Sequence, residues 1–248
     1  MSMKIIFGDS TDLIDSINEK IGLIVTSPPY KDCDGFDLDK ITKVFQSCYS
    51  KLENNSLMFV NFGHLKNMKS RPFKLVEAIE QCGFELYDTI IWVKNHYTPI
   101  RGNNLNNLFE YIFVFVKGQC PKINRLSIGI PYKDKSNIGR YSDKDLKCRG
   151  NVWFINYETI NSKSQKKHPD RFPLQLPLDC IKLSGIKNDS LVLDPFCGSG
   201  TTLIAAESLG INSIGIEKNQ KYYCAAKNNI DNFKQTTRIT SELLQSNN

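Results

Sequence analysis

Apolar runs and amphipathic stretches alternate along most of this 248-residue chain. Short apolar runs predict buried strands, and apolar positions three or four residues apart predict helices. The alternation of the two is typical of an α/β sandwich with a largely parallel sheet. We expect strands at 4–7, 23–26, 57–62, 84–93, 111–116, 190–193 and 213–216, and helices at 39–52, 72–82, 176–183, from about 199 and from about 220.

The order of these elements also predicts a reversed strand and an insert. The runs at 84–93 and 111–116 have no helix between them, so they should pair antiparallel and reverse one edge of the sheet. From 118 to 167 the periodicity fades, and Gly, Pro, Asn, Ser and basic residues dominate. The predicted organisation is one domain in two halves, 1–117 and 168–237, with a loop-rich insert at 118–167 between them and a polar tail at 238–248.

Positive charge is concentrated in the insert. Residues 117–167 hold twelve Lys or Arg and four Asp or Glu, a local net charge of +8, whereas the whole chain has a net charge of +6. A near-neutral body with one basic segment suits a polyanionic partner such as nucleic acid. A solvated lysine-rich loop accounts for the same charge equally well, so the pattern alone leaves both open.

Composition excludes several classes of protein. No apolar run approaches the roughly 18 residues that a membrane span needs, and the short first apolar run, interrupted by Asp9, does not fit a signal peptide. The eight cysteines are too far apart in sequence for a metal-binding pair. We therefore expect a cytoplasmic protein with reduced thiols, no membrane contact and no metal.

The pentapeptide Thr26-Ser27-Pro28-Pro29-Tyr30 directly follows an apolar run. Two prolines end a strand because neither donates a ladder hydrogen bond, and each holds the residue before it extended. The result is a stiff edge that offers a hydroxyl, bare carbonyls and an aromatic ring at one point. Such an edge suits a flat, polar group such as the amino edge of a nucleobase.

A second constellation reads Asp194-Pro195-Phe196-Cys197-Gly198-Ser199-Gly200-Thr201-Thr202, between a strand and a helix. Glycines in such a turn let a ligand approach the backbone, and Glu217, nineteen residues after Gly198, is placed to bind ribose hydroxyls. The dinucleotide fingerprint is not met, because Leu203 replaces its third small residue and Asp194 would repel a pyrophosphate. S-adenosylmethionine, which has a cationic amino-acid end and no phosphate, fits better.

Together the two motifs resemble those of the DNA amino-methyltransferases, which methylate N4 of cytosine or N6 of adenine. Their catalytic motif reads (Asp/Asn/Ser)-Pro-Pro-(Tyr/Phe), and their cofactor motif commonly reads Asp-Pro-Phe-x-Gly-Ser-Gly-Thr-Thr. The order of the motifs, the element His168-Pro-Asp-Arg-Phe172-Pro173 and the run 109–117 are similar to the circularly permuted β group of this family. The resemblance covers residues 4 to about 230 without the insert. It implies a Rossmann-like methyltransferase fold, with the catalytic half at 1–117 and the cofactor-binding half at 168–237.

The resemblance also implies roles for the matching residues. The Ser27 hydroxyl and the Pro28 carbonyl would accept hydrogen bonds from the target amino group, beside Pro29, and Tyr30 would stack on the base. The residues alone also allow simpler roles, namely a helix cap for Asp9 and core packing for Phe172. The expected contacts with S-adenosylmethionine are Asp9, Phe172, Pro173, Asp194, Phe196, Gly198, Ser199, Gly200, Thr201 and Glu217.

By the same resemblance, 118–165 is the target-recognition segment and the substrate is double-stranded DNA with a flipped base. Ser27 favours cytosine N4 in an enzyme of a restriction-modification system, whereas the adenine enzymes mostly carry Asp or Asn there. Adenine N6 is the alternative, and a non-catalytic DNA-binding relative is a distant one. The recognition sequence, a homodimer and a companion restriction endonuclease stay open. The expected DNA contacts are Lys133, Lys135, Arg140, Lys147 and Arg149.

Overall fold

The computed structural model describes residues 2–29, 36–63, 68–95, 103, 105–140, 143–156 and 172–246, with side chains up to 237. Within these ranges one eight-stranded sheet has the order β1-β8-β7-β2-β3-β5-β4-β6. Its strands are β1 (Met3–Phe7), β2 (Ile21–Thr26), β3 (Leu52–Phe62), β4 (Glu85–Val93), β5 (Phe109–Lys117), β6 (Val152–Phe154), β7 (Leu191–Asp194) and β8 (Asn212–Glu217).

The sheet is mostly parallel, as predicted. The five neighbouring strands β1, β8, β7, β2 and β3 all run in one direction. The reversed strand is β5, which lies between β3 and β4 and is antiparallel to both. The loop-rich insert contributes one strand that was not predicted, β6, which pairs parallel with β4. Three residues are too short to show a pattern, although Val, Trp and Phe are all strand formers.

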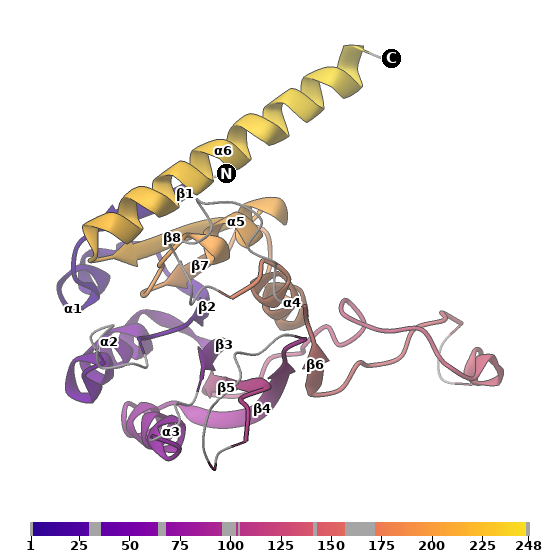
Figure 1. Cartoon of the computed structure of the whole chain (residues 1–248), viewed down its shortest axis with the longest axis horizontal. Coiled ribbons are helices and arrows are strands. Elements are labelled where there is room, and N and C mark those ends of the chain that lie inside the picture. Colours follow the sequence, from indigo (N-terminus) through magenta and orange to yellow (C-terminus); the bar gives the residue numbers. More distant parts are fainter. Residues whose placement is uncertain are drawn as a thin grey trace.

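Helices cover both faces of the sheet and confirm the α/β sandwich (Figure 1). One face carries α1 (Ser10–Leu13), the 3₁₀ turn η1 (Ile14–Ser16), α2 (Leu38–Lys51) and α3 (Arg71–Gln81). The other carries α4 (Gln175–Ser184) and α5 (Thr201–Ser208), and α6 (Gln220–Ser246) contacts β1, β8 and α5. Helix α6 continues through positions 238–246, so this part of the predicted polar tail has a helical backbone.

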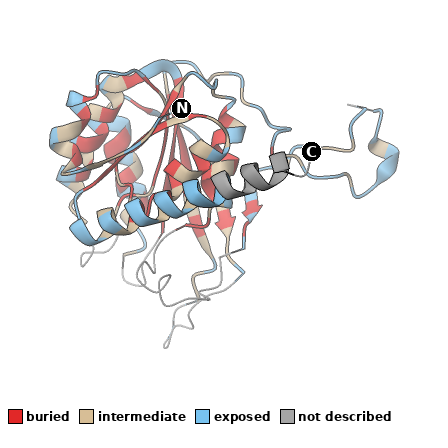
Figure 2. Cartoon of the chain, turned by 90° about the horizontal axis from the view of Figure 1, so that it is seen from above, coloured by how far each residue is buried: buried red, intermediate tan, exposed pale blue. Residues whose placement is uncertain are grey.

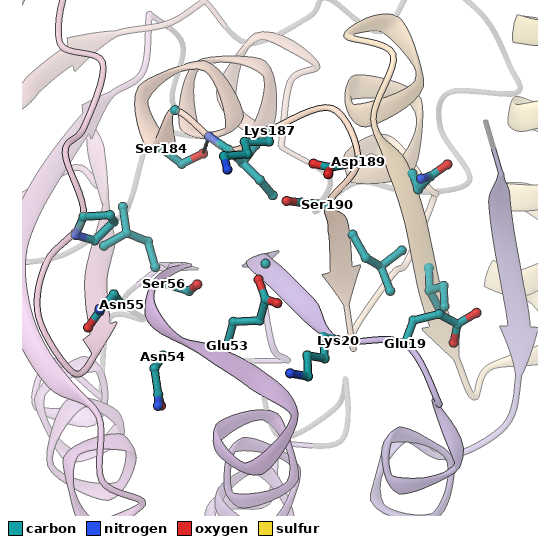
Figure 3. Close-up of a pocket in the computed structure, with 18 of the residues that line it drawn as sticks. Glu19, Lys20, Glu53, Asn54, Asn55, Ser56, Ser184, Lys187, Asp189 and Ser190 are labelled. Carbon is teal, nitrogen blue, oxygen red and sulfur yellow. Dashed lines mark hydrogen bonds between the residues drawn. The ribbon is translucent and has the colours of Figure 1, made fainter.

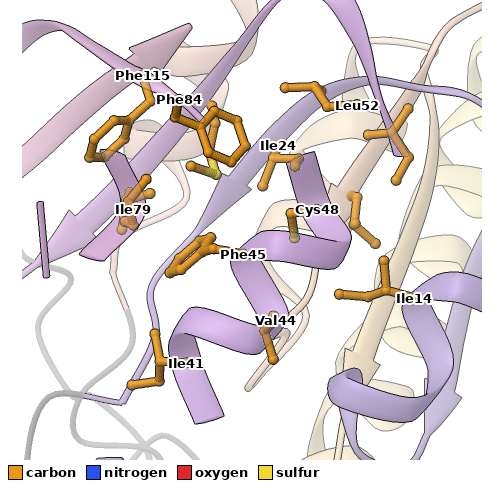
Figure 4. Packing of buried hydrophobic residues seen from close by; sticks show 14 of the residues in the cluster. Ile14, Ile24, Ile41, Val44, Phe45, Cys48, Leu52, Ile79, Phe84 and Phe115 are labelled. Carbon is orange, nitrogen blue, oxygen red and sulfur yellow. The ribbon is translucent and has the colours of Figure 1, made fainter. Parts of the chain in front are cut away.

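The sheet separates two apolar clusters. Ile24 and Phe45 belong to the cluster between the sheet and α1–α3 (Figure 4). Leu23, the neighbour of Ile24, belongs with Trp92 and Trp153 to the cluster beneath α4 and α5, since successive strand side chains point to opposite faces. Figure 2 shows the buried strands between helices whose outer faces are exposed. Burial on both faces explains why the central strands read as continuous apolar runs.

Membrane-spanning helices and metal-binding groups can be assessed in the described part of the chain. No helix in the described part of the chain is long and apolar enough to cross a membrane. Among the same residues, no three His, Cys, Asp or Glu side chains are placed to hold a metal ion. The seven cysteines that the structure describes are all free thiols.

Gly215, in β8, has no room for a side chain. A Cβ there would lie 2.5 Å from Cys197 Sγ and 2.7 Å from Leu203 Cδ1, both buried. We expect Gly215→Ala to lower the free energy of unfolding by about 1–3 kcal/mol through overpacking, measured by urea denaturation. Ser213→Ala on the same strand is the control, because the buried Ser213 hydroxyl has no hydrogen-bond partner among the described atoms. Wild-type stability of Gly215→Ala would contradict this account of the packing.

Candidate active site

The predicted site residues converge on one edge of the sheet. Asp9 follows β1, Glu217 ends β8, Asp194 ends β7 and Ser27 follows β2. These four strands are neighbours and run in the same direction, so the four residues lie along the carboxyl edge of the sheet. The crevice outside this edge is where open α/β sheets bind their ligands.

The two motifs are joined by a hydrogen bond. Thr26, the last residue of β2, donates from its hydroxyl to the Asp194 carboxylate at 2.6 Å, and both side chains are 1% exposed. The next residues lie at the edge itself: Pro28 is buried, whereas Ser27 and Pro29 are partly exposed. The structure therefore places the Ser-Pro-Pro edge directly beside the glycine turn. Tyr30 lies outside the described residues.

The Asp194 carboxylate is buried among hydrogen-bond donors. Besides the Thr26 hydroxyl it accepts from the backbone N–H of Phe196, at 3.1 Å, and from the Thr202 side chain. Burial disfavours the charge and raises the pKa of Asp194 to about 6, and the hydrogen bonds oppose this rise. At neutral pH the site thus holds a buried anion, which suits a cationic ligand.

Glu217 holds the glycine turn against β8. Its Oε2 accepts from the backbone N–H of Gly198 at 2.8 Å, and its Oε1 accepts from that of Asn219 at 2.7 Å. Burial raises the pKa of Glu217, and the charge of Asp194 raises it further. Gly198 and Gly200 have φ values of +53° and +82°, where side chains are disfavoured. The turn therefore presents bare backbone beside two acids.

The remaining predicted cofactor residues have clear structural roles. Asp9 caps α1 by accepting from the Thr11 N–H at 3.1 Å, and its Oδ2 lies 3.6 Å from Lys218 Nζ. Phe172 is buried in the cluster beneath α4, and the Pro173 carbonyl accepts a backbone hydrogen bond at the start of that helix. The simpler alternatives, helix cap and core packing, are thus observed, and contact with a cofactor stays a prediction. His168 lies outside the described residues.

The other residues of the turn are also tied to their surroundings. Phe196 packs edge-on against Phe45 of α2, with the ring centroids 6.2 Å apart. The Ser199 hydroxyl lies 3.0 Å from that of Thr201, and the Ser199 carbonyl accepts from Asn229 of α6 at 3.0 Å. Contacts with α2 and α6 therefore hold the turn in place before any ligand binds.

The basic insert forms an arm that reaches away from the body (Figure 1). Ile130 and Lys147 exchange backbone hydrogen bonds of 3.0 and 2.9 Å, which pairs the two sides of the arm. Beyond this bridge lies the 3₁₀ turn η3 (Lys135–Asn137). Lys133, Lys135 and Arg140 are exposed there, and Lys135 forms an ion pair with Asp145.

Arg149 differs from the other predicted DNA contacts. Its Nη2 lies 2.7 Å from Oδ2 of Asp179 in α4, and its guanidinium lies 4.3 Å from the ring centroid of Trp153. The arginine side chain is 17% exposed and that of Asp179 is 4% exposed. This guanidinium therefore anchors β6 and its approach to α4, a role that accounts for it without DNA.

A polar pocket of about 770 Å³ lies at the opposite, amino edge of the sheet (Figure 3). Its lining includes Leu191 and Asn212, where β7 and β8 begin, and the charged residues Lys20, Glu53 and Asp189. None of the predicted site residues lines it. The pocket is therefore separate from the candidate active site.

The connection between the two motifs was not predicted from the sequence. Thr26 and Thr202 both reach Asp194, and the Thr202 hydroxyl also lies 3.4 Å from the Val25 carbonyl. The one signal in the sequence is that Thr26 closes an otherwise apolar strand with a hydroxyl.

Three comparisons agree on the kind of protein. The sequence profile of the N6/N4 type, described as DNA methylase, matches residues 21–228. The orphan methyltransferase M.BamHII of Bacillus amyloliquefaciens is 29% identical over 86% of this chain and 89% of its own length. The type II methyltransferase M.SmaI of Serratia marcescens is 26% identical over 92% of this chain and 91% of its own.

Solved structures share the fold. The cytosine-N4-specific PvuII DNA methyltransferase aligns with a TM-score of 0.71 at 22% identity, over 90% of this chain and 84% of its own. The complex of M1.HpyAVI with SAM aligns with a TM-score of 0.65 at 24% identity, over 92% of this chain and 98% of its own. The eight-stranded sandwich is therefore the fold of known methyltransferases.

The raised pKa of Asp194 predicts a particular pH dependence of stability. Its shift from 3.8 to about 6 corresponds to roughly 3 kcal/mol. The folded state binds the extra proton, so this stability is fully present below pH 4 and is lost as the pH rises through 6. We expect the unfolding free energy of wild type relative to Asp194→Asn to fall over that window, measured by urea denaturation. Asp189→Asn, on an exposed loop, is the matched control. A difference that stays constant from pH 4 to 7 would refute the shift.

Proposed function

Since the chain belongs to the N6/N4 family of DNA methylases, we propose that it methylates N4 of cytosine in double-stranded DNA. The family uses S-adenosylmethionine as its methyl donor. One observation carries the proposal: the Ser27–Pro28 edge and the glycine turn end neighbouring strands and are joined by the Thr26–Asp194 hydrogen bond. A base held at the first and a cofactor held at the second would meet at the ends of β2 and β7.

The residues around the turn suit S-adenosylmethionine. Asp194 supplies a buried carboxylate for its cationic methionine part, and Glu217 supplies oxygens for its ribose hydroxyls. Gly198 and Gly200 leave the backbone bare for close approach, with Phe196 and Ser199 beside them. The first N–H groups of α5, from Thr201 on, favour the methionine carboxylate. We assign Asp9, Phe172 and Pro173 to the rest of the cofactor, Asp9 near its adenine.

The Ser27–Pro28 edge addresses the weak nucleophilicity of the target nitrogen. The lone pair of that amino group is conjugated with the ring. Hydrogen bonds from its two N–H groups to the Ser27 hydroxyl and the Pro28 carbonyl would favour rehybridisation and direct the lone pair outward, while Tyr30 stacks on the base for about 1–3 kcal/mol. S-adenosylmethionine supplies the methyl group from its sulfonium sulfur. Orientation by the chain therefore provides most of the rate, and the base must leave the duplex.

The identity of Ser27 supports cytosine as the target. In the family that the motifs resemble, Ser at the first motif position is associated with cytosine, whereas Asp or Asn mostly accompanies adenine. Relatives of this chain include type II methyltransferases and an orphan one. We propose that the chain modifies a short site and protects it from a companion restriction endonuclease.

The arm is the proposed DNA contact. Lys133, Lys135, Arg140 and Lys147 lie along it, and the first three of them are exposed. Lysines contact phosphate as point charges, whereas arginine can also read guanine bidentately. We assign Arg149 to the fold and not to this surface.

The methylated base identifies the reaction. We expect incubation with S-adenosylmethionine and DNA, digestion to nucleosides and mass spectrometry to yield N4-methyldeoxycytidine. Ser27→Ala should lower turnover by about 100-fold, because one hydrogen-bond acceptor for the amino group is lost, and should leave the affinity for S-adenosylmethionine, titrated calorimetrically, roughly unchanged. N6-methyldeoxyadenosine as the product would reject cytosine as the target, and lost cofactor binding in Ser27→Ala would reject the assigned role.

Neutralising the arm should weaken DNA binding in a salt-dependent manner. For Lys133→Gln/Lys135→Gln/Arg140→Gln we expect lower affinity and a slope of log K against log salt that is reduced by up to about 3, near 0.9 for each lost phosphate contact. The matched control is Lys4→Gln/Lys20→Gln/Lys187→Gln, which removes the same charge from exposed positions at the amino edge. Equal slopes in the two triple variants would remove the arm from the interface.

A further inference from the structure

We propose that Thr26 is a positioning residue that couples the glycine turn to the Ser27–Pro28 edge, an inference that rests on the proposed function. Its hydroxyl donates to Asp194 at 2.6 Å across 168 positions of sequence. Both side chains are buried, so water hardly competes for this bond, and a low dielectric strengthens it. Ser27 is the next residue, and Pro28 holds the backbone of Ser27 extended. A shift of Thr26 is therefore passed on to Ser27.

The hydrogen bond begins where the backbone ladder between the two strands ends. Strands β2 and β7 pair through Leu23–Val192 and Ile24–Leu193. Past that register, side chains make the connection, because Thr26 reaches Asp194 directly and Thr202 of α5 lies between Asp194 and the Val25 carbonyl. On the β3 side the ladder continues to Thr26–Val60, so it is the connection of Ser27 to the turn on the β7 side that depends on hydroxyl groups.

Asp194 makes this connection sensitive to the cofactor. A cation bound beside the carboxylate favours its ionised form, and hydrogen bonds to an ionised acceptor are shorter and stronger than those to a neutral one. Occupation of the turn would therefore keep Asp194 ionised, and its hydrogen bond to Thr26 strong, down to a lower pH. A displacement of about 1 Å at such a position can cost on the order of 100-fold in rate.

The test removes only the hydroxyl. Thr26→Val keeps the branched shape, and Thr26→Ser keeps the donor. We expect Thr26→Val to lower kcat by about 10–100-fold with little change in KM for DNA, because the arm is untouched, and Thr26→Ser to recover most of the rate. A purely structural bond would lower stability and leave the kcat of the folded protein unchanged.

A second readout is the pH profile of kcat. Without the Thr26 donor the ionised form of Asp194 is less stabilised, so the acid limb should move to higher pH in Thr26→Val and return in Thr26→Ser. Among the residues that the structure describes, the other titratable groups close to this carboxylate are Glu217 of β8, Cys197 of the turn and Cys48 of α2, and all are unchanged in both variants.

Failure of this inference is distinguishable from failure of the proposed function. Wild type that forms no methylated base rejects the function. Active wild type together with a folded Thr26→Val that has the same kcat and the same acid limb overturns the positioning role. If Thr26→Val does not fold, Thr26→Ser and Thr26→Ala, which differ only in the hydroxyl, repeat the comparison, and equal kcat values in that pair overturn it.

Discussion

The buried hydrogen bond between Thr26 and Asp194 is the contact through which the two halves of the chain form one site. A buried carboxylate without donors would carry a desolvation penalty of several kcal/mol, and each hydrogen bond to a charged group returns about 1.5–3 kcal/mol. Asp194 therefore depends on the Thr26 hydroxyl to stabilise its buried charge, and the end of β2 is tied to β7 through the same hydrogen bond. Strands from opposite sides of the insert are therefore held together at the edge where the two motifs lie.

Two buried carboxylates repel each other at the same edge. Asp194 and Glu217 are both buried, and the charge of Asp194 raises the pKa of Glu217 beyond the effect of burial alone. Backbone N–H groups at Phe196, Gly198 and Asn219 stabilise the two carboxylates but do not neutralise them. Two acids held close together at the end of a sheet are typical of a ligand site, and a cationic ligand relieves their repulsion.

Most of the fold could be predicted because the central strands are buried on both faces and read as continuous apolar runs. The glycine turn and the proline edge were recognisable because their chemistry is local. The strand β6, the partner of Arg149 and the contacts of Thr26 depend on residues far apart in sequence. Asp179, for example, lies thirty positions from Arg149 and has no pattern that marks it as a partner. In the sequence Arg149 looks like the exposed basic residues around it, because its burial is decided by tertiary packing.

The acidic groups of the candidate site and the basic groups of the arm lie apart, which explains how an acidic site would accept DNA. The buried carboxylates beside the glycine turn would repel phosphates, whereas the exposed cations that the proposed function assigns to DNA lie on an arm that reaches away from the body (Figure 1). A neutral base, by contrast, meets no such repulsion when it approaches the hydroxyl and carbonyl of Ser27 and Pro28. In the proposed function the polyanion therefore stays at the arm and only the flipped base enters the acidic edge. Base flipping is then required by electrostatics as well as by access to the amino group.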